Sequence, residues 1–224
     1  MKKIFILFTL FIASISLLAF TGCGKKNDKT REIDISLTGK EASDAYDALI
    51  NYLKTTDKLK VNLVADDYTV TSYLVGTSYY SIYTEGDYVD KSWTWVEDGA
   101  YYVAFWDSDD GGEYSQDKEE YEWVYRNYLF DFHNDFLGPT SISFTEKGEE
   151  TLKDDGTVES SKAQCKYTVE FDDEVLEITV EVENGIIKQI ESNDIYQGEP
   201  YKKTITFEYE FDFTFEKPDF ASED

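Results

Sequence analysis

The sequence predicts an α+β fold in which a curved antiparallel β-sheet, an incomplete barrel, packs against two amphipathic helices. Three observations support this prediction. Several runs alternate apolar and polar residues, turn-forming residues separate these runs, and two other stretches repeat apolar residues at spacings of three and four. Alternation gives each strand one covered face and one solvated face, which is typical of antiparallel sheets. We therefore expect a single half-barrel domain over residues 39–219 and an acidic tail over residues 220–224.

The first helix is predicted from about Gly39 to Thr55. Thr38 and Glu41 have the spacing of a capping box, which satisfies free backbone donors at a helix start. One face of this helix should pack on the sheet, because its apolar residues recur at helical spacing: Ala45, Tyr46, Leu49, Ile50 and Leu53.

From Lys60 to Trp106 the pattern has period two, and four turn signals divide it into four or five strands. The clearest hairpin joins residues 91–96 to residues 100–106 through Asp98-Gly99, since Asp-Gly readily adopts positive φ angles. Further strands are predicted over residues 141–145, 164–171, 175–183, 185–193 and 201–216, with a second hairpin turn at Asn184-Gly185.

The second helix is predicted to begin at Ser115, a favourable N-cap residue, and to end by Leu137 before Gly138-Pro139. Its apolar positions form one strongly aromatic face: Tyr121, Val124, Tyr125, Tyr128, Leu129, Phe132 and Phe136. The last predicted strand is also two-faced, because aromatic residues alternate with acidic residues and threonines up to Glu216.

The N-terminus has the pattern of a secretory signal over residues 1–22. Lys2 and Lys3 precede an uncharged, mostly apolar run from Ile4 to Phe20, and small residues follow. A retained transmembrane anchor is the alternative, although the run is shorter than the roughly 20 residues that span a bilayer.

Cys23 follows Thr21 and Gly22, and this sequence resembles the bacterial lipobox. The resemblance implies that Cys23 becomes the first mature residue, carries a diacylglyceryl group and anchors the protein to the outer face of the bacterial cell membrane. Residues 23–38 would then hold the lipidated cysteine and a flexible tether. Basic residues near the anchor either favour anionic headgroups or belong to a solvated linker: Lys25, Lys26, Lys29 and Arg31.

The element order, the lipidated N-terminus and the closing segment Phe213-Thr-Phe-Glu-Lys-Pro218 together resemble the Lol-type superfamily of bacterial lipoproteins and lipoprotein carriers. In that family an incomplete antiparallel barrel is wrapped around helices. The resemblance implies that the concave, aromatic-lined side of the sheet can hold acyl chains.

Composition and motifs exclude several function classes. A net charge of −26 disfavours binding to nucleic acid, which requires basic surfaces. His133 is the sole histidine, and GxSxG, GxGxxG and P-loop motifs are absent. Cys165 lies in a strand-like run and is interpreted as a buried, inert thiol rather than a nucleophile. We therefore expect a non-enzymatic protein with no catalytic residue, metal or cofactor. The acidic loop over residues 107–113 is either solvated or a weak cation site.

The expected function is that a monomer binds a lipid or another hydrophobic or amphipathic ligand between the sheet and the helices. The candidate ligand-binding residues are aromatic: Trp93, Trp95, Tyr101, Phe105, Tyr121, Tyr125, Tyr128 and Phe132. Two other classes stay open. One is a cell-surface interaction module that binds a protein or cell-wall polymer through an aromatic patch, and the other is a hydrolase with carboxylates converging in a cleft.

Overall fold

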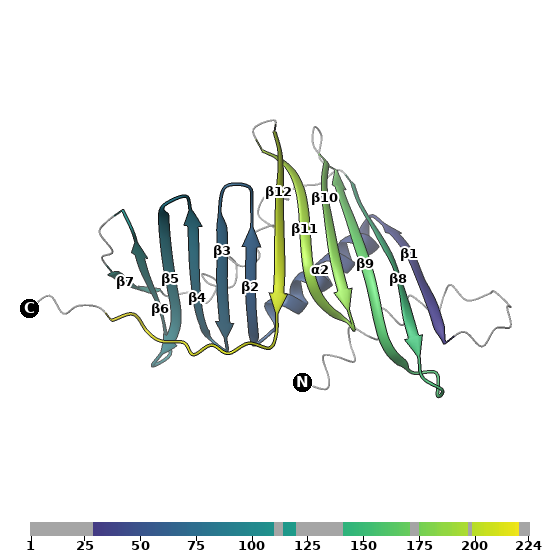
Figure 1. Cartoon of the computed structure of the whole chain (residues 1–224), viewed down its shortest axis with the longest axis horizontal. Helices are drawn as coiled ribbons and strands as arrows, with labels where there is room; N and C mark the ends of the chain where they lie inside the picture. Colours follow the sequence, from purple (N-terminus) through teal and green to yellow (C-terminus); the bar gives the residue numbers. More distant parts are fainter. Residues whose placement is uncertain (1–28, 110–113, 120–140, 171–174, 197–198, 220–224) are drawn as a thin grey trace, which may run out of the picture. The chain divides into compact units, whose positions relative to one another are not determined.

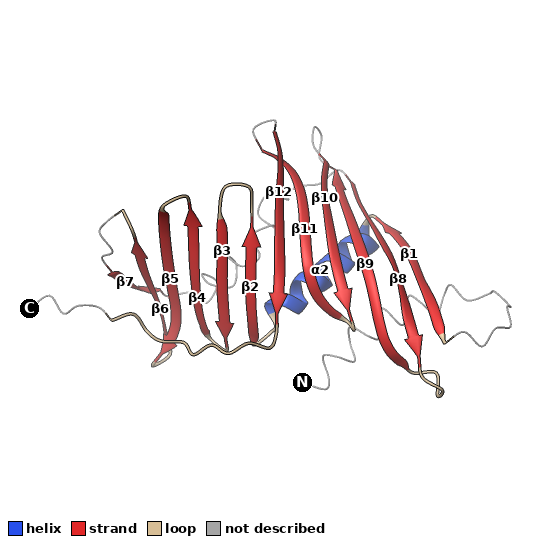
Figure 2. Ribbon diagram, viewed as in Figure 1, coloured by secondary structure: helices blue, strands red, loops and turns tan. Residues whose placement is uncertain are grey.

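A computed structural model describes residues 29–109, 114–119, 141–170, 175–196 and 199–219 of the chain. These residues form mostly antiparallel β-sheet together with one helix, α2 (Lys40–Lys54), as Figures 1 and 2 show. The strands are β1 (Thr30–Thr38), β2 (Lys58–Val64), β3 (Thr69–Val75), β4 (Ser78–Glu85), β5 (Tyr88–Glu97), β6 (Ala100–Asp107), β7 (Tyr114–Glu119), β8 (Ser141–Leu152), β9 (Val158–Glu170), β10 (Val175–Glu183), β11 (Ile186–Tyr196) and β12 (Glu199–Glu208).

The chain divides into two compact units, and the predicted domain over residues 39–219 includes parts of both. The first unit holds residues 1–49 and 138–197, and the second holds residues 50–137 and 198–224. The strand order is β1-β8-β9-β10-β11 in the first unit and β12-β2-β3-β4-β5-β6-β7 in the second. Neither unit closes into a barrel within the described residues, because β1 does not pair with β11 and β7 does not pair with β12. The prediction of an open antiparallel sheet is therefore confirmed.

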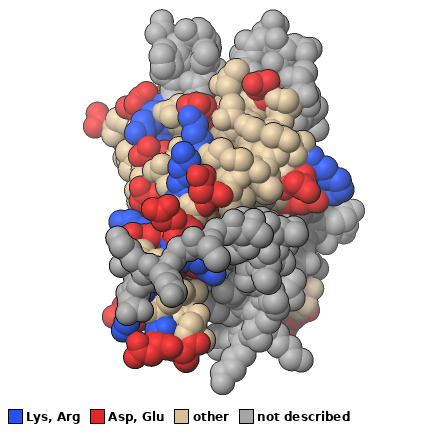
Figure 3. Space-filling model, turned by 90° about the vertical axis from the view of Figure 1, so that its right-hand side faces the viewer, with Lys and Arg blue, Asp and Glu red and all other residues tan. Residues whose placement is uncertain are grey.

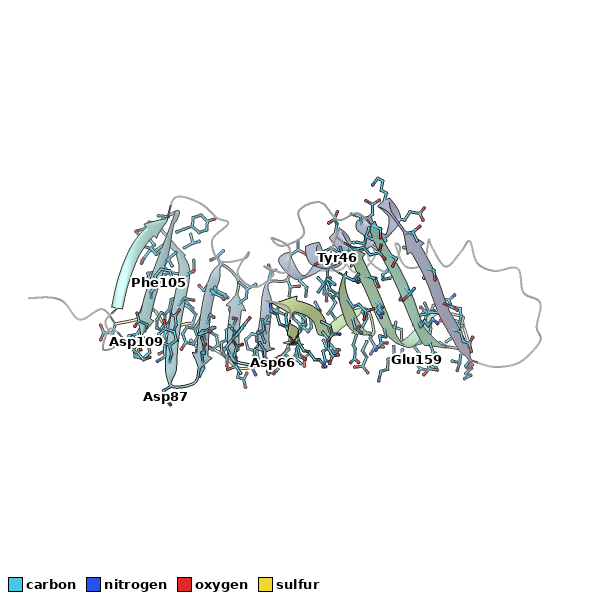
Figure 4. The ribbon with its side chains drawn as sticks, turned by 90° about the horizontal axis from the view of Figure 1, so that it is seen from above. Tyr46, Asp66, Asp87, Phe105, Asp109 and Glu159 are labelled. Carbon is cyan, nitrogen blue, oxygen red and sulfur yellow. The ribbon has the colours of Figure 1, made fainter. Side chains whose placement is uncertain are left out.

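The start of helix α2 is tied to the sheet of the first unit. The amide of Gly39, which has a positive φ of 58°, donates a hydrogen bond of 2.9 Å to the carbonyl oxygen of Ile142 on β8. Ala42 and Tyr46 are buried, and the Tyr46 ring meets the Tyr167 ring of β9 edge-on at 5.2 Å between centroids. Figure 4 labels Tyr46 on α2 beside these strands. The predicted packing of this helix on a sheet is confirmed.

The inner face of the first unit is the face that packs on α2. Strand pairing places the inward side chains in rows that run across the strands, and one row joins Leu37, Phe144, Tyr167 and Ile178. Gly148 lies on the same face of β8, two rows further along, where it pairs with Ile33 and Ala163. A Cβ atom there would lie 2.7 Å from the Ala163 Cα and closer still to the carbonyl oxygen of Lys162. Because both atoms belong to the backbone of β9, the two strands approach too closely for a side chain at this position.

The predicted second helix is wrong at its start. Ser115 lies in β7, which pairs with β6 from Tyr101↔Glu119 to Trp106↔Tyr114. The free edge of β6 supplies hydrogen-bond partners to this segment, and tertiary pairing overrides the local N-cap preference. Residues 120–140, which include Tyr121, Tyr125, Tyr128 and Phe132, lie outside the described residues. Among the described residues α2 is the one helix, so a second amphipathic helix is not found there.

The predicted flexible tether over residues 23–38 is also shorter than expected. Thr30–Thr38 forms strand β1, which pairs with β8 in register from Thr30↔Thr151 to Thr38↔Ser143. Its alternation of exposed and half-buried residues is that of a strand with one covered face, and Ile33, Ile35 and Leu37 lie on the inner side. Two turns match their predictions, since Asp98-Gly99 and Asn184-Gly185 all have positive φ angles.

Candidate functional site

Six aromatic residues lie on one face of the sheet of the second unit. Directly paired residues of an antiparallel sheet share a face. Pairing places Tyr73, Tyr80 and Trp93 in one row across β3, β4 and β5. It also places Trp95 opposite Tyr102 and Lys91 opposite Trp106 on β5 and β6. We call this surface the aromatic face, and it consists of Tyr73, Tyr80, Trp93, Trp95, Tyr102 and Trp106.

The rings of the aromatic face contact one another across the strands. The Tyr80 and Trp93 centroids are 5.1 Å apart, and the Trp95 and Tyr102 rings are nearly parallel, with centroids 5.5 Å apart. Trp93 and Trp95 are buried, whereas the tyrosines and Trp106 are half-buried. Such a surface combines apolar area with hydroxyl and indole N–H groups, a combination enriched at interfaces.

The chain after β12 crosses the aromatic face. The sequence predicted one strand over residues 201–216, but β12 ends at Glu208, and the prediction is wrong beyond that residue. The reason is that Glu208 pairs with Lys60, only two residues from the start of β2 at Lys58, so little partner strand remains. The following segment, Tyr209–Lys217, runs along the lower ends of the strands of the second unit in Figure 1, and we call it the strap.

The strap places three alternate side chains, Phe211, Phe213 and Phe215, on the aromatic face. The Phe213 ring stacks on Tyr73 with centroids 4.2 Å apart and an interplanar angle of 10°, and it also runs parallel to Tyr80 at 6.0 Å. Phe211 meets Tyr73 edge-on at 5.9 Å, and Phe215 meets Trp95 at 6.4 Å. The alternation of aromatic and polar residues that predicted a two-faced strand thus places aromatic rings for stacking. Each aromatic pair stabilises the fold by about 0.5–1.5 kcal/mol beyond the effect of its buried area.

Lysines fasten both ends of the strap. The Lys58 ammonium donates a hydrogen bond of 2.6 Å to the carbonyl oxygen of Phe211 and lies 4.6 Å from the centre of its ring. Lys217 forms an ion pair of 2.7 Å with Glu97 and lies 5.6 Å from the Trp95 ring centre. Hydrogen bonds from Lys217 and Trp95 lower the pKa of Glu97. Exposed ion pairs add little stability, so ring stacking is the main interaction that holds the strap.

The four predicted ligand-binding residues that the structure describes are divided between the two faces of the sheet. Trp93 and Trp95, which are 8% and 3% exposed, lie on the aromatic face. Tyr101 and Phe105 pair with Val96 and Ser92 and so lie on the opposite face, where Phe105 is 43% exposed. The other four candidates lie outside the described residues. Sequence reasoning missed Tyr73, Tyr80, Tyr102 and Trp106, although the hairpin register through Asp98-Gly99 would have placed Tyr102 beside Trp95.

One edge of the second unit is acidic. Because successive strands alternate in direction, the turns after β2, β4 and β6 lie at the same edge. Figure 4 looks onto this edge and labels Asp66, Asp87 and Asp109, one from each turn. On β5 and β6, Asp90 pairs directly with Asp107, and burial together with the Asp107 charge raises the pKa of Asp90. Of the acidic loop over residues 107–113, only the first three residues are described. This edge attracts cationic groups.

The outer face of the first unit carries an open, charged groove of about 630 Å³. Exposed carboxylates lie on β1, β8 and β10 and exposed lysines on β8, β9 and β11, and Figure 3, which views the side that carries β1, shows both charges intermixed there. The groove is lined by Glu32, Asp34, Glu149, Glu181 and Glu183 together with Lys147, Lys162, Lys188 and Gln164. A surface with charges so mixed and so exposed does not by itself define a ligand.

A carboxyl group is buried on the inner face of the first unit. Glu146 is 6% exposed and pairs with Ile35 on β1 and Cys165 on β9. Burial, together with the charge of Glu150, raises the pKa of Glu146 to about 7. Glu150 itself accepts a hydrogen bond of 2.8 Å from Arg31 Nε. Cys165 is buried, as predicted, and forms no disulfide within the described residues. Burial raises the pKa of its thiol, which disfavours the reactive thiolate.

Comparisons with family models, with curated proteins and with solved structures find no match to this chain. In the part of the chain that the structure describes, no helix is long and apolar enough to cross a membrane. The candidate site therefore rests on the geometry of the aromatic face and its strap.

Replacing Glu146 by Gln should remove a pH-dependent loss of stability. A raised folded-state pKa means that the folded protein keeps a proton that the unfolded chain releases, so stability falls as pH rises from about 4.5 to about 7. The loss is at most about 3 kcal/mol. Urea unfolding followed by circular dichroism should give the free energy of unfolding of each protein. The difference by which Glu146→Gln falls below wild type should be larger at pH 5 than at pH 8. A pH-independent difference would contradict this assignment, and Glu149→Gln, which is exposed on the same strand, is the control.

Proposed function

We propose that this chain is a lipid-anchored, extracytoplasmic protein without enzymatic activity that binds an extended polypeptide partner on the aromatic face of its second unit. The observation that carries this proposal is the strap. An extended segment of the chain itself lies on the aromatic face and packs the half-buried side chains of Phe211, Phe213 and Phe215 against it. Because the rings of the aromatic face are spaced to contact alternate side chains of the strap, they are also spaced to contact those of an extended segment from a partner.

The spacing of the contacts favours a polypeptide over a sugar polymer. In an extended chain alternate side chains are about 6.6–6.8 Å apart on one side. Phe213 and Phe215 use this spacing to reach Tyr73 and Trp95. Tyr102 and Trp106 extend the same face on β6 and are half-buried. The Lys91 ammonium lies 4.3 Å from the centre of the Trp106 ring, so a further side chain would reach this ring beside or in place of Lys91.

Charge favours a partner with basic residues between its apolar ones. The strap carries Glu210, Asp212 and Glu216 between its aromatic residues, although the chain as a whole has a net charge of −26. The net negative charge of the chain raises the free energy of the strap in place and would attract a basic segment. On the face itself Lys58 lies against Phe211 and Lys91 lies against Trp106, so this attraction comes from the chain as a whole and not from the aromatic face.

The hydrophobic ligand expected between sheet and helices involves Tyr121, Tyr125, Tyr128 and Phe132, which lie outside the described residues. The strap, in contrast, is described throughout. The proposal therefore follows the interaction-module alternative.

Membrane attachment rests on the lipobox resemblance at Thr21-Gly22-Cys23. Strand β1 begins at Thr30, so residues 24–29 alone separate the anchor from the sheet. Fully extended, six residues span about 20 Å. In this proposal the lipid anchor holds the first unit within that distance of the membrane surface. The acidic body of the protein is not itself attracted to anionic lipid headgroups.

Replacing Cys23 by Ala should release the protein from the membrane. Because two acyl chains give stable anchoring and the thiol is the site of attachment, the variant should lose metabolic labelling by palmitate and leave the membrane fraction. Replacement of Cys165, the other cysteine, should leave labelling intact. Labelled, membrane-bound Cys23→Ala protein would contradict the anchor.

Replacing Trp106 by Ala should weaken binding of a basic, alternating peptide. The probe is a synthetic copy of residues 209–217 with lysine at each acidic position, and its control is a peptide of the same composition with adjacent phenylalanines. Loss of one aromatic contact should raise the Kd about tenfold by calorimetry. Phe105→Ala is the matched control, since Phe105 is the adjacent residue and lies on the opposite face.

Three results would contradict the proposed function. The first is equal binding of both peptides, the second is an equal effect of Trp106→Ala and Phe105→Ala, and the third is binding of a chitin-type hexasaccharide in place of the peptide. Stoichiometric uptake of a fluorescent fatty acid would favour the hydrophobic-ligand class instead.

A further inference from the structure

Strand β1 is an edge strand whose backbone polarity can be assigned. The Gly39 amide bonds to Ile142, and the Leu152 amide bonds to Lys29, at the two ends of the β1–β8 pair. Both pairs continue the β1–β8 register, in which Thr30 opposes Thr151 and Thr38 opposes Ser143. Hydrogen-bonded pairs alternate along an antiparallel ladder, so the odd-numbered residues of β1 bond to β8. The backbone groups of Glu32, Asp34, Ser36 and Thr38 therefore point to the open edge.

The edge is open within the described residues, since β1 ends the strand order of its unit and pairs with β8 alone. Its inward side chains Ile33, Ile35 and Leu37 are half-buried. Two strands further into the sheet, the residues in the same rows are buried: Cys165 lies in the row of Ile35, and Tyr167 lies in the row of Leu37. An added strand would complete the burial of these rows and pair the outward backbone groups.

We propose that β1 is a homotypic interface, at which a second copy of this chain adds its own β1 antiparallel to the first. The sequence Glu32-Ile-Asp-Ile-Ser-Leu-Thr38 is complementary to itself about Ile35. With a two-fold axis at Ile35, Glu32 faces Thr38 of the second copy and Asp34 faces Ser36. On the inner side Ile33 faces Leu37, and Ile35 faces Ile35.

Charge selects this register over its neighbours. A two-fold axis at Ile33 would place Glu32 against Asp34 of the second copy, and an axis at Asp34 would place that carboxylate against itself. Like charges directly opposite destabilise a strand pair. An axis at Ser36 avoids this repulsion but leaves Glu32 without a partner residue in the strand. The axis at Ile35 thus pairs every outward backbone group from Glu32 to Thr38.

The phase of the backbone agrees with the same axis. Asp34 and Ser36 have outward amides and carbonyls, so each can exchange both hydrogen bonds with its opposite residue in the second copy. Ile35 then occupies a non-hydrogen-bonded position, where opposing side chains are closest. A single edge pair buries little area, and anchoring of both copies in one membrane would supply the effective concentration that such a contact requires. This interface departs from the expected monomer.

The test uses the full-length, lipidated chain in phosphatidylcholine vesicles. Ile35→Cys should form a disulfide-linked dimer on mild oxidation, because opposed residues at this position bring their Cα atoms within about 5 Å. Ile33→Cys is the matched control. Its two copies would be displaced by four residues along the strands, about 13 Å apart, and should give at least tenfold less dimer. A mixture of Ile33→Cys and Leu37→Cys chains should again crosslink.

Adding Ser36→Pro to Ile35→Cys should abolish the crosslink. The Ser36 amide points away from β8, so proline removes an edge donor and keeps the β1–β8 bonds. Ser36→Ala should retain the crosslink, and an unchanged circular dichroism melt verifies folding of each variant. Equal crosslinking at positions 33 and 35, or a crosslink that survives Ser36→Pro in folded protein, would overturn the proposal. Should Ser36→Pro fail to fold, the comparison of positions 33, 35 and 37 decides alone.

Discussion

Antiparallel strands send successive side chains to opposite faces, and this period of two determines what each surface of the protein contains. On β6 a shift of one residue separates Tyr102, which stacks on Trp95, from Tyr101, which faces the other way. On β1 it separates Ile35 in the inner rows from Asp34 on the outer face. A slip of one residue in any strand would exchange these faces, so register is the constraint on which the aromatic face, the buried Glu146 and the open edge of β1 all depend.

The same period continues where the sheet ends. Beyond Glu208 the chain has almost no partner strand, yet its alternation of aromatic and acidic residues remains. Phe213 then stacks on Tyr73 instead of entering a ladder. An extended segment held by side chains has fewer backbone hydrogen bonds than a strand, and such segments belong to the less stable part of a fold. This property is what would let a polypeptide of suitable sequence compete for the aromatic face.

Local signals predicted the elements whose determinants are local. The bounds of β10 match the predicted strand over residues 175–183, and both hairpin turns have the positive φ angles that Asp98-Gly99 and Asn184-Gly185 favour. Ser115 was misassigned because its conformation depends on the distant edge of β6. Strand β1 shows clear alternation, but its position shortly after Cys23, in a sequence that resembles a lipobox, favoured a tether. For the candidate site, alternation identified Trp93 and Trp95. The strap could not be predicted, because a strand and an extended segment outside a sheet show the same alternation of apolar and polar residues. The chain leaves the sheet after Glu208 because β2, its partner strand, begins at Lys58.

The most direct measurement asks whether the strap is a separable ligand of the aromatic face. A chain that ends at Glu208 should fold with a red-shifted tryptophan fluorescence, because Trp95 loses its contact with Phe215. A synthetic peptide of residues 209–219 should then bind with one-to-one stoichiometry and reverse the shift. The same peptide with Phe213→Ala should bind about tenfold more weakly. Unchanged fluorescence on truncation, or equal binding of the two peptides, would contradict a binding surface at the aromatic face.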